Sequence, residues 1–352
     1  MGIVLDVLFL KFNSFVKELI SPLFTFEIKP CSWYKKNDFI DLTLFMSVMN
    51  CYAEGLSQTL REHKHTPTSE TLLDYLKTIN ADNLLEKAKT QIDLCIETLK
   101  NKGITLDKVA IAFDWHDLPY YGSHQTEGII GTKPKNGTAY AFSFLTISVL
   151  TPHKRIVLAV IPLKTRKDLP TTVLQLLSHV QQRIKNLFYV AFDNGFQDSQ
   201  LLQALINQQI PFVIPLRDTV KLQKRWRWKR YAKRFNYTTQ GMEIDVVEAV
   251  DTKANRYFLG TNMRGRPKTI LKLYKKRWGI ETSYRMIGQF QPKTTSNSYV
   301  IRVFYFVLAV LLYNVWVLLN VRVKKHVKVV RLKLSCFWSL PSGIVDLEKS
   351  GG

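Results

Sequence analysis

The sequence contains few cysteines and few acidic residues. Its four cysteines include no Cys-x-x-Cys pair and no histidine at zinc-site spacing: Cys31, Cys51, Cys95 and Cys336. This pattern excludes a disulfide-stapled domain, argues against a structural zinc site and favours thiols in a reducing cytoplasm. Sixteen glycines and thirteen prolines without a period exclude collagen-like chains. Because 46% of the 352 residues are apolar, wholesale disorder is also excluded.

The shortage of acidic residues gives the chain a formal net charge of +22, from 50 Lys and Arg against 28 Asp and Glu. Residues 1–100 carry 11 basic and 13 acidic side chains, whereas residues 101–352 carry 39 and 15. So strong a positive charge predicts a polyanionic partner, either nucleic acid or an anionic membrane surface. Most of the attraction should come from the later part of the chain.

One long apolar run could be mistaken for a membrane span. Val303 to Leu319 holds a single polar residue, Asn314, and has basic residues on both flanks. Its 17 residues lie at the short end of what crosses a bilayer. A helix buried on all sides within a large protein is the favoured interpretation, and we expect no membrane partner.

Residues 1–104 are predicted to form a helical N-terminal region. Apolar residues at three- and four-residue spacing predict helices over 38–50, 53–62, 69–79 and 82–100. The turn at 66–69, which offers an N-cap, is typical of a helix-turn-helix, but the helix after it holds Glu70, Asp74 and only Lys77. DNA recognition and a packing or self-association role both stay open for this region.

The hydrophobic period changes after residue 104, which predicts an α/β fold. Strands are expected over 108–114, 139–150, 155–163, 187–193 and 211–216, with helices over 169–184 and 199–207. These elements form a mixed sheet within residues 105–216. A basic, β-rich insertion is expected over 217–267, with strands at 242–250 and 256–261. Helices follow over 268–322, and a basic tail over 323–352.

Two predicted strands end in the same way, as Ala-Phe-Asp, at Asp114 and Asp193. A single such Asp usually caps the next element. Two of them in one sheet favour a functional pair, because adjacent strands would bring the carboxylates together. Paired carboxylates repel unless a cation lies between them, and their hard oxygens suit Mg²⁺ or Mn²⁺.

A third acid is expected at Glu281, within a strongly basic helical stretch. At about 100° per residue, Tyr274, Arg277, Glu281 and Arg285 fall on one stripe about 80° wide. A lone Glu among cations is usually a salt-bridge partner, but a phenol and two guanidinium groups on its face suit gripping a phosphate beside a metal.

Taken in order, Asp114, the Asp193-Asn-Gly-Phe turn and the Tyr274-x2-Arg277-x3-Glu281 helix resemble a DDE transposase of the insertion-sequence-four-like group, over residues 105–320. The resemblance implies an RNase H-like mixed sheet and a β-rich insertion in a prokaryotic, cytoplasmic and nucleoid-associated enzyme. It also implies that Asp114, Asp193 and Glu281 are catalytic and hold two Mg²⁺ (or Mn²⁺) ions. The expected reaction is cleavage at element ends and strand transfer into target DNA. Double-stranded DNA (terminal inverted repeats and target) and a homodimer are the implied partners.

The sequence departs from the family pattern at one position, and other readings stay open. The pattern places a Lys near position 288, where this chain has Gly288. Either Arg285 supplies that phosphate contact, or the chain is a decayed remnant that only binds DNA. An RNase H-like nuclease or resolvase without strand transfer is the rival enzyme. His116 and Asp117 beside the first Asp are expected to make local hydrogen bonds rather than metal contacts.

The stretch from Lys221 to Arg234 holds eight basic residues and no acid. Basic runs usually form a solvated face, but interleaved aromatic residues favour nucleic-acid contact, since indoles stack on exposed bases while cations hold the backbone. The expected DNA-binding residues are Tyr274, Arg277 and Arg285 together with Arg225, Trp226, Arg227, Trp228 and Arg230.

Overall fold

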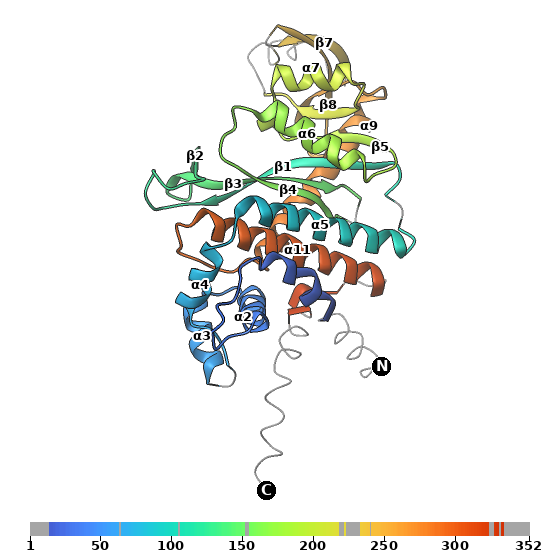
Figure 1. Ribbon diagram of the computed structural model, residues 1–352. Helices are drawn as coiled ribbons and strands as arrows, with labels where there is room; N and C mark the ends of the chain where they lie inside the picture. The colour runs from blue at the N-terminus through green and yellow to red at the C-terminus, as the bar shows by residue number, and fades with distance from the viewer. Residues whose placement is uncertain are drawn as a thin grey trace.

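The computed structural model describes residues 14–62, 65–104, 106–151, 155–217, 222, 233–239, 241–323, 327–330 and 332–333. One mixed sheet lies between two layers of helices (Figure 1). Helices α6 (Leu169–Gln181) and α7 (Ser199–Asn207) lie on one side of it, and α5 (Ala81–Asn101) and α11 (Tyr299–Val323) lie on the other. The predicted mixed α/β class with a helical N-terminal region is confirmed.

The central strands and helices follow one another along the chain in the predicted order. Strands β1 (Val109–Pro119), β3 (Thr138–Val149) and β4 (Val157–Leu163) pair antiparallel, while β5 (Leu187–Ala191) and β6 (Phe212–Pro215) continue the sheet parallel to β1. The connections from β4 to β5 and from β5 to β6 pass through α6 and α7, because parallel strands need a long connection, which is usually a helix.

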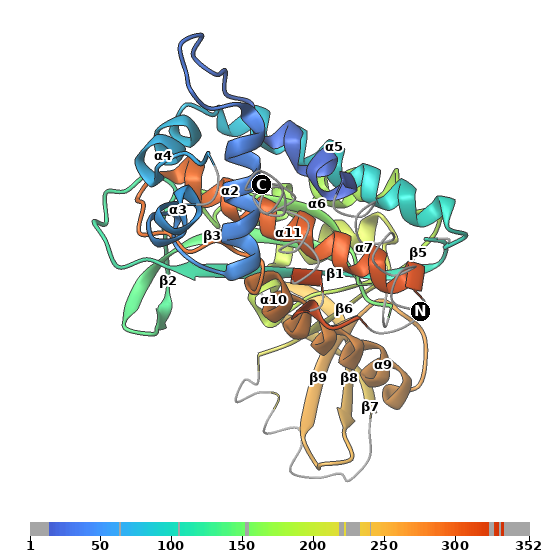
Figure 2. The ribbon, with the colours of Figure 1, turned by 90° about the horizontal axis from the view of Figure 1, so that it is seen from below.

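Strand β2 (Ile130–Lys135) was not predicted. It forms a hairpin with the start of β3 through Asn136 and Gly137, whose φ angles are +55° and +82°. Asn-Gly with both residues at positive φ suits a two-residue hairpin turn. Figure 2 shows this hairpin projecting from the body of the protein.

The β-rich insertion extends the main sheet. Strands β8 (Met242–Val250) and β9 (Arg256–Thr261) have the predicted bounds, and β7 (Lys233–Thr239) is added at the outer edge. Because β9 pairs antiparallel with β6, the order β6-β9-β8-β7 forms one continuous sheet with the core. Figure 2 shows these strands on the side of the molecule opposite α4.

The N-terminal region contains the short 3₁₀ helix η1 (Ser21–Leu23) and the helices α2 (Lys36–Met49), α3 (Ala53–Arg61) and α4 (Ser69–Lys77) before α5. The side chain of Thr68 caps α4 by accepting a hydrogen bond from Thr71 N at 3.1 Å, as the turn before this helix predicted. Helix α4 buries Leu72 and Leu76 and lies against α11. One face of the possible helix-turn-helix is therefore used for packing.

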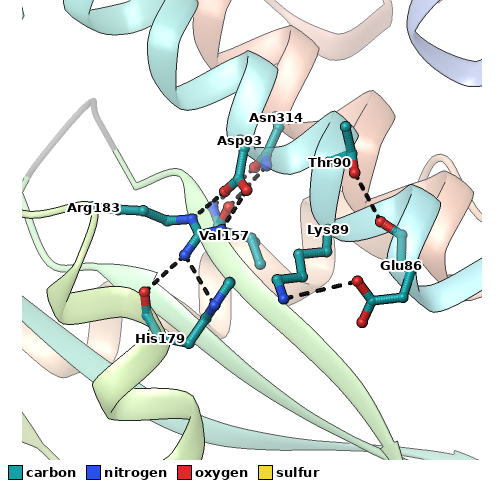
Figure 3. A network of polar contacts seen from close by, with 8 residues as sticks. All are labelled: Glu86, Lys89, Thr90, Asp93, Val157, His179, Arg183 and Asn314. Atoms are coloured by element: carbon teal, nitrogen blue, oxygen red, sulfur yellow. Dashed lines mark hydrogen bonds and ion pairs between the residues drawn. The ribbon is translucent and has the colours of Figure 1, made fainter.

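Polar contacts connect helix α5 with α6, and helix α11 with the sheet (Figure 3). Asp93 on α5 forms a two-pronged ion pair with Arg183, which follows α6 and also donates to the carbonyl oxygen of His179 at 2.8 Å. On the neighbouring helix α11, Asn314 accepts from the backbone N of Val157 and donates to its O, both at 2.9 Å. These contacts join α5 to α6, and α11 to β4.

Helix α11 contains the apolar run that could have been a membrane span. Within the described part of the chain, Tyr299–Val321 is the one stretch long and apolar enough to cross a bilayer, with a mean hydropathy of 2.1. In the structure, 83% of its apolar window is buried inside the protein. The prediction of a core helix is confirmed, since α11 packs against α5, α4, α10 and β4.

Candidate active site

Two of the predicted acidic residues meet at one edge of the sheet. The parallel pairing of β1 and β5 sets Ala112 opposite Ala191, and Asp114 and Asp193 each follow two residues later. Asp193 comes after the end of β5, as predicted. Asp114 does not end its strand, because β1 continues to Pro119 by pairing with β3 from Ile111 onward. Only the parallel pairing of β1 with β5 stops before Asp114, at Ala112. Another element can therefore approach Asp114 beyond the end of β5.

That element brings Arg277 between the two carboxylates. Its Nη1 lies 3.5 Å from Asp114 Oδ2, and its Nη2 lies 3.5 Å from Asp193 Oδ1. The guanidinium is buried, with 6% of the residue exposed, and its Nε has no hydrogen-bond partner among the residues that the structure describes. Both separations exceed those of a strong charge-assisted hydrogen bond. Arg277 therefore acts here as a positive charge shared by two acids.

The electrostatic surroundings of Asp114 are unfavourable for its negative charge. Burial raises the pKa of Asp114 to about 6, and the charges of Asp193 and Glu281 act in the same direction. Arg277 and a hydrogen bond from Trp115 N to Asp114 Oδ1 at 3.0 Å oppose this shift only in part. Burial is thus the main reason why the ionised form of Asp114 is disfavoured, and an added cation beside it would favour that form.

The predicted catalytic helix is broken into three elements. Tyr274 lies in α9 (Pro267–Lys275), Arg277 in the 3₁₀ turn η3 (Lys276–Trp278), and Glu281 and Arg285 in α10 (Gly279–Gly288). The four residues consequently do not form one stripe. Tyr274 is buried at 5% exposure, whereas Glu281 and Arg285 are exposed.

The chain passes closely against another arginine at the start of α10. A Cβ added to Gly279 would lie 2.1 Å from the guanidinium carbon of Arg155. A side chain at position 279 would have to displace the end of the flexible Arg155 side chain, so glycine allows this close approach. The approach lies at the first residue of α10, two residues before Glu281.

The turn after Asp193 is held by aromatic packing. The indole of Trp115 stacks on Phe196 with ring centroids 4.3 Å apart. A Cβ on Gly195 would lie 3.1 Å from Trp115 Nε1, so glycine permits this packing. Asp117, two residues after Trp115 on β1, makes hydrogen bonds, as expected. It accepts from the hydroxyl of Ser143 at 2.5 Å and from Arg166 at 2.8 Å.

His116 has a different role from the expected hydrogen bonding. Its ring stacks between Tyr284 and Phe306, with centroids 4.9 and 5.0 Å away. Burial lowers the pKa of His116 to about 4, so the imidazole is neutral near pH 7. Tyr284 was not singled out from the sequence, although its position three residues after Glu281 on the same helix was a usable signal.

Five of the predicted DNA-binding residues, Arg225, Trp226, Arg227, Trp228 and Arg230, lie outside the described residues. Among the residues that the structure describes, no three His, Cys, Asp or Glu side chains form a ready-made metal cluster. Gly288 has no heavy atom within 4 Å of an added Cβ, so a side chain would fit there. An unpredicted aromatic residue, Trp278, is 48% exposed next to Arg277.

Comparisons with known proteins point to one family. Residues 105–315 match the family model described as a transposase DDE domain. The fold resembles that of the piggyBac transposase, solved by cryo-electron microscopy in a synaptic complex with hairpin DNA, with a TM-score of 0.63 and 12% identity. That similarity covers 98% of this chain and 82% of the other. No curated protein matches the sequence.

Proposed function

We propose that this chain, which belongs to the DDE transposase family, cleaves DNA at the ends of a mobile element and transfers the exposed 3′ ends into target DNA. The observation that carries the proposal is the meeting of Asp114 and Asp193 at one buried guanidinium, with Glu281 acting electrostatically on the first of them. The Tyr274-x2-Arg277-x3-Glu281 spacing further supports the insertion-sequence-four-like group and, with it, a prokaryotic cytoplasmic enzyme.

The acidic residues fit a divalent-metal site by their chemistry. Asp114, Asp193 and Glu281 offer hard carboxylate oxygens, and burial and mutual repulsion leave Asp114 in need of a neighbouring cation. These three residues would hold the metal, Mg²⁺ or Mn²⁺. When bound, two such ions supply activation of the attacking water and neutralisation of the leaving oxygen. Arg277 meanwhile keeps the two aspartates together by sharing its charge between them.

The surrounding basic residues suit a DNA substrate. Arg285 is exposed on α10, one turn after Glu281, where it is placed to contact a phosphate beside the acids. Tyr274 is buried and packs near Tyr257, so its contribution is to support Arg277, whose guanidinium lies 5.8 Å from its ring. We infer that double-stranded element ends and target DNA are the substrates, held by a homodimer.

The test uses a plasmid carrying the gene between its own flanking sequences, with purified protein and Mg²⁺. Asp114→Asn, Asp193→Asn and Glu281→Gln should each abolish cleavage, because each removes a negative charge at nearly constant shape. DNA binding, measured by mobility shift, should persist in all three. Asp117→Asn is the matched control, since this acid lies in the same strand but pairs with Arg166 away from the site.

The products distinguish the proposed activity from its rivals. Cleaved ends that become joined to a second plasmid support transposition. Cleavage without joining would instead identify a nuclease, and binding without either step would identify a catalytically inactive DNA-binding protein. Substantial Mg²⁺-dependent cleavage by any one of the three variants would remove that residue from the site.

A further inference from the structure

A hydrogen bond crosses from the catalytic helix to the catalytic sheet at a point between two of the acids. The hydroxyl of Tyr284, on α10, bonds to Oγ1 of Thr146 on β3. Thr146 is the register partner of Asp114 in the antiparallel β1–β3 pair. Tyr284 itself follows Glu281 by three residues, on the same helix. One contact thus joins the strand pair that carries Asp114 to the helix that carries Glu281.

The ring of Tyr284 is held as firmly as its hydroxyl. It stacks on His116 at an interplanar angle of 18°, and His116 in turn stacks on Phe306 of α11. Phe306 stacks on Phe144 of β3 with centroids 4.0 Å apart. These stacking contacts orient the ring of Tyr284, and its hydroxyl bonds to Thr146.

The start of helix α10 is not fixed by a side-chain cap. It begins directly after the 3₁₀ turn η3, and its N-cap residue, Trp278, makes no side-chain capping hydrogen bond. Two other polar contacts hold α10 among the described residues. Ser283 receives a hydrogen bond from Tyr313 of α11 at 2.9 Å, and the carbonyl oxygen of Gly288 accepts one from the side chain of Asn50 at 3.1 Å. These contacts tie α10 to α11 and to the end of α2, and not to the strand pair that carries Asp114.

We propose that Tyr284 is a positioning residue that fixes Glu281 relative to Asp114 through Thr146, so that the carboxylates bind divalent metal together. This inference rests on the proposed function of the site. Residues that support metal ligands typically change metal affinity by about 10- to 100-fold when they are removed. Tyr284→Phe keeps the aromatic stack and removes only the hydroxyl, so its effect isolates the hydrogen bond.

The experiment measures Mn²⁺ binding to the full-length protein by titration calorimetry, without DNA, and then the metal dependence of cleavage. Tyr284→Phe should weaken Mn²⁺ binding about tenfold, at the lower end of that range. Its cleavage rate should recover at saturating metal. Thr146→Val should have the same effect. The double variant Tyr284→Phe with Thr146→Val should bind Mn²⁺ no more weakly than either single variant, because both changes remove the same hydrogen bond. Thr146→Ser should retain wild-type binding, since it keeps a hydroxyl.

Two controls decide the result. Tyr313→Phe also removes a buried hydroxyl that contacts α10, but on the side of α11, and should leave Mn²⁺ affinity unchanged. Asp114→Asn should lose Mn²⁺ binding. Two results would overturn the positioning role of Tyr284 and leave the proposed metal site standing, provided that Asp114→Asn loses Mn²⁺ binding. In the first, Tyr284→Phe binds Mn²⁺ as tightly as wild type. In the second, Tyr313→Phe weakens Mn²⁺ binding as much as Tyr284→Phe does. If Asp114→Asn binds Mn²⁺ like wild type, the proposed metal site fails as well.

Discussion

Replacing Asp114 by Asn is expected to stabilise the folded protein near neutral pH, although the change removes a proposed metal ligand. Burial, with the charges of Asp193 and Glu281, raises the pKa of Asp114 from 3.8 to about 6. A difference of about 2 pKa units between the folded and unfolded chains corresponds to about 3 kcal/mol. With an unfolding entropy of about 2.1 cal/mol/K per residue, this free energy raises the midpoint of thermal unfolding by about 4 °C.

The two pKa values of Asp114 set the pH range over which its effect on stability changes. Well below pH 3.8 the carboxyl group is protonated in both states, and well above pH 6 it is ionised in both. In between, the folded chain keeps a proton that the unfolded chain has released, so the stability of the wild type falls as pH rises. Asp114→Asn lacks this titration. Its advantage in unfolding free energy should therefore grow from near zero at about pH 4 to its full value by about pH 7.

Thermal unfolding followed by circular dichroism between pH 4 and 8 measures this difference. Asp93→Asn serves as the control of opposite sign, because it removes a carboxylate held by Arg183 and should lower stability. Mg²⁺ at ten times its dissociation constant should stabilise the wild type by about 1.4 kcal/mol and leave Asp114→Asn unchanged. If Asp114→Asn were less stable than wild type at pH 7.5 without metal, Arg277 would fully compensate the buried charge and the reasoning would be wrong.

Three further changes test other parts of the molecule. Gly288→Lys adds a cation where nothing lies within 4 Å of the new Cβ, so the slope of log K against log salt for DNA binding should steepen by about 1; an unchanged slope would contradict this. Trp226→Ala with Trp228→Ala should weaken binding to frayed DNA ends more than to intact duplex, by about 1–3 kcal/mol per stacked base, and equal losses would argue for packing roles. Asn314→Leu leaves the backbone N–H and C=O of Val157 unpaired, so urea unfolding should show a loss of about 2–4 kcal/mol; unchanged stability would mean that α11 is not anchored in this way.

The parts of the fold that the sequence predicts well are those specified by local pattern. Strands β8 and β9 begin and end where alternation and flanking turns place them, and the pairing of β1 with β5 follows from two apolar runs that end alike. The β2–β3 hairpin was missed, although Asn136-Gly137 is a strong local hairpin signal. Its first strand is short and exposed along most of its length, so it lacks the apolar alternation from which the other strands were inferred.

The parts that were wrong or missed depend on contacts between distant segments. Helical periodicity gives no sign of the 3₁₀ turn between Lys275 and Gly279. That turn lies where the chain passes close to Arg155, more than a hundred residues away. Strand β1 continues past Asp114 for a similar reason, since β3 pairs with it as far as Pro119. A carboxylate at the end of a strand can be approached from several directions. A carboxylate within a continuing strand can be approached only from the face of the sheet on which it lies. On that face lie Arg277 and Tyr284, so the same long-range pairing that the sequence hides also determines which residues are able to reach the acid.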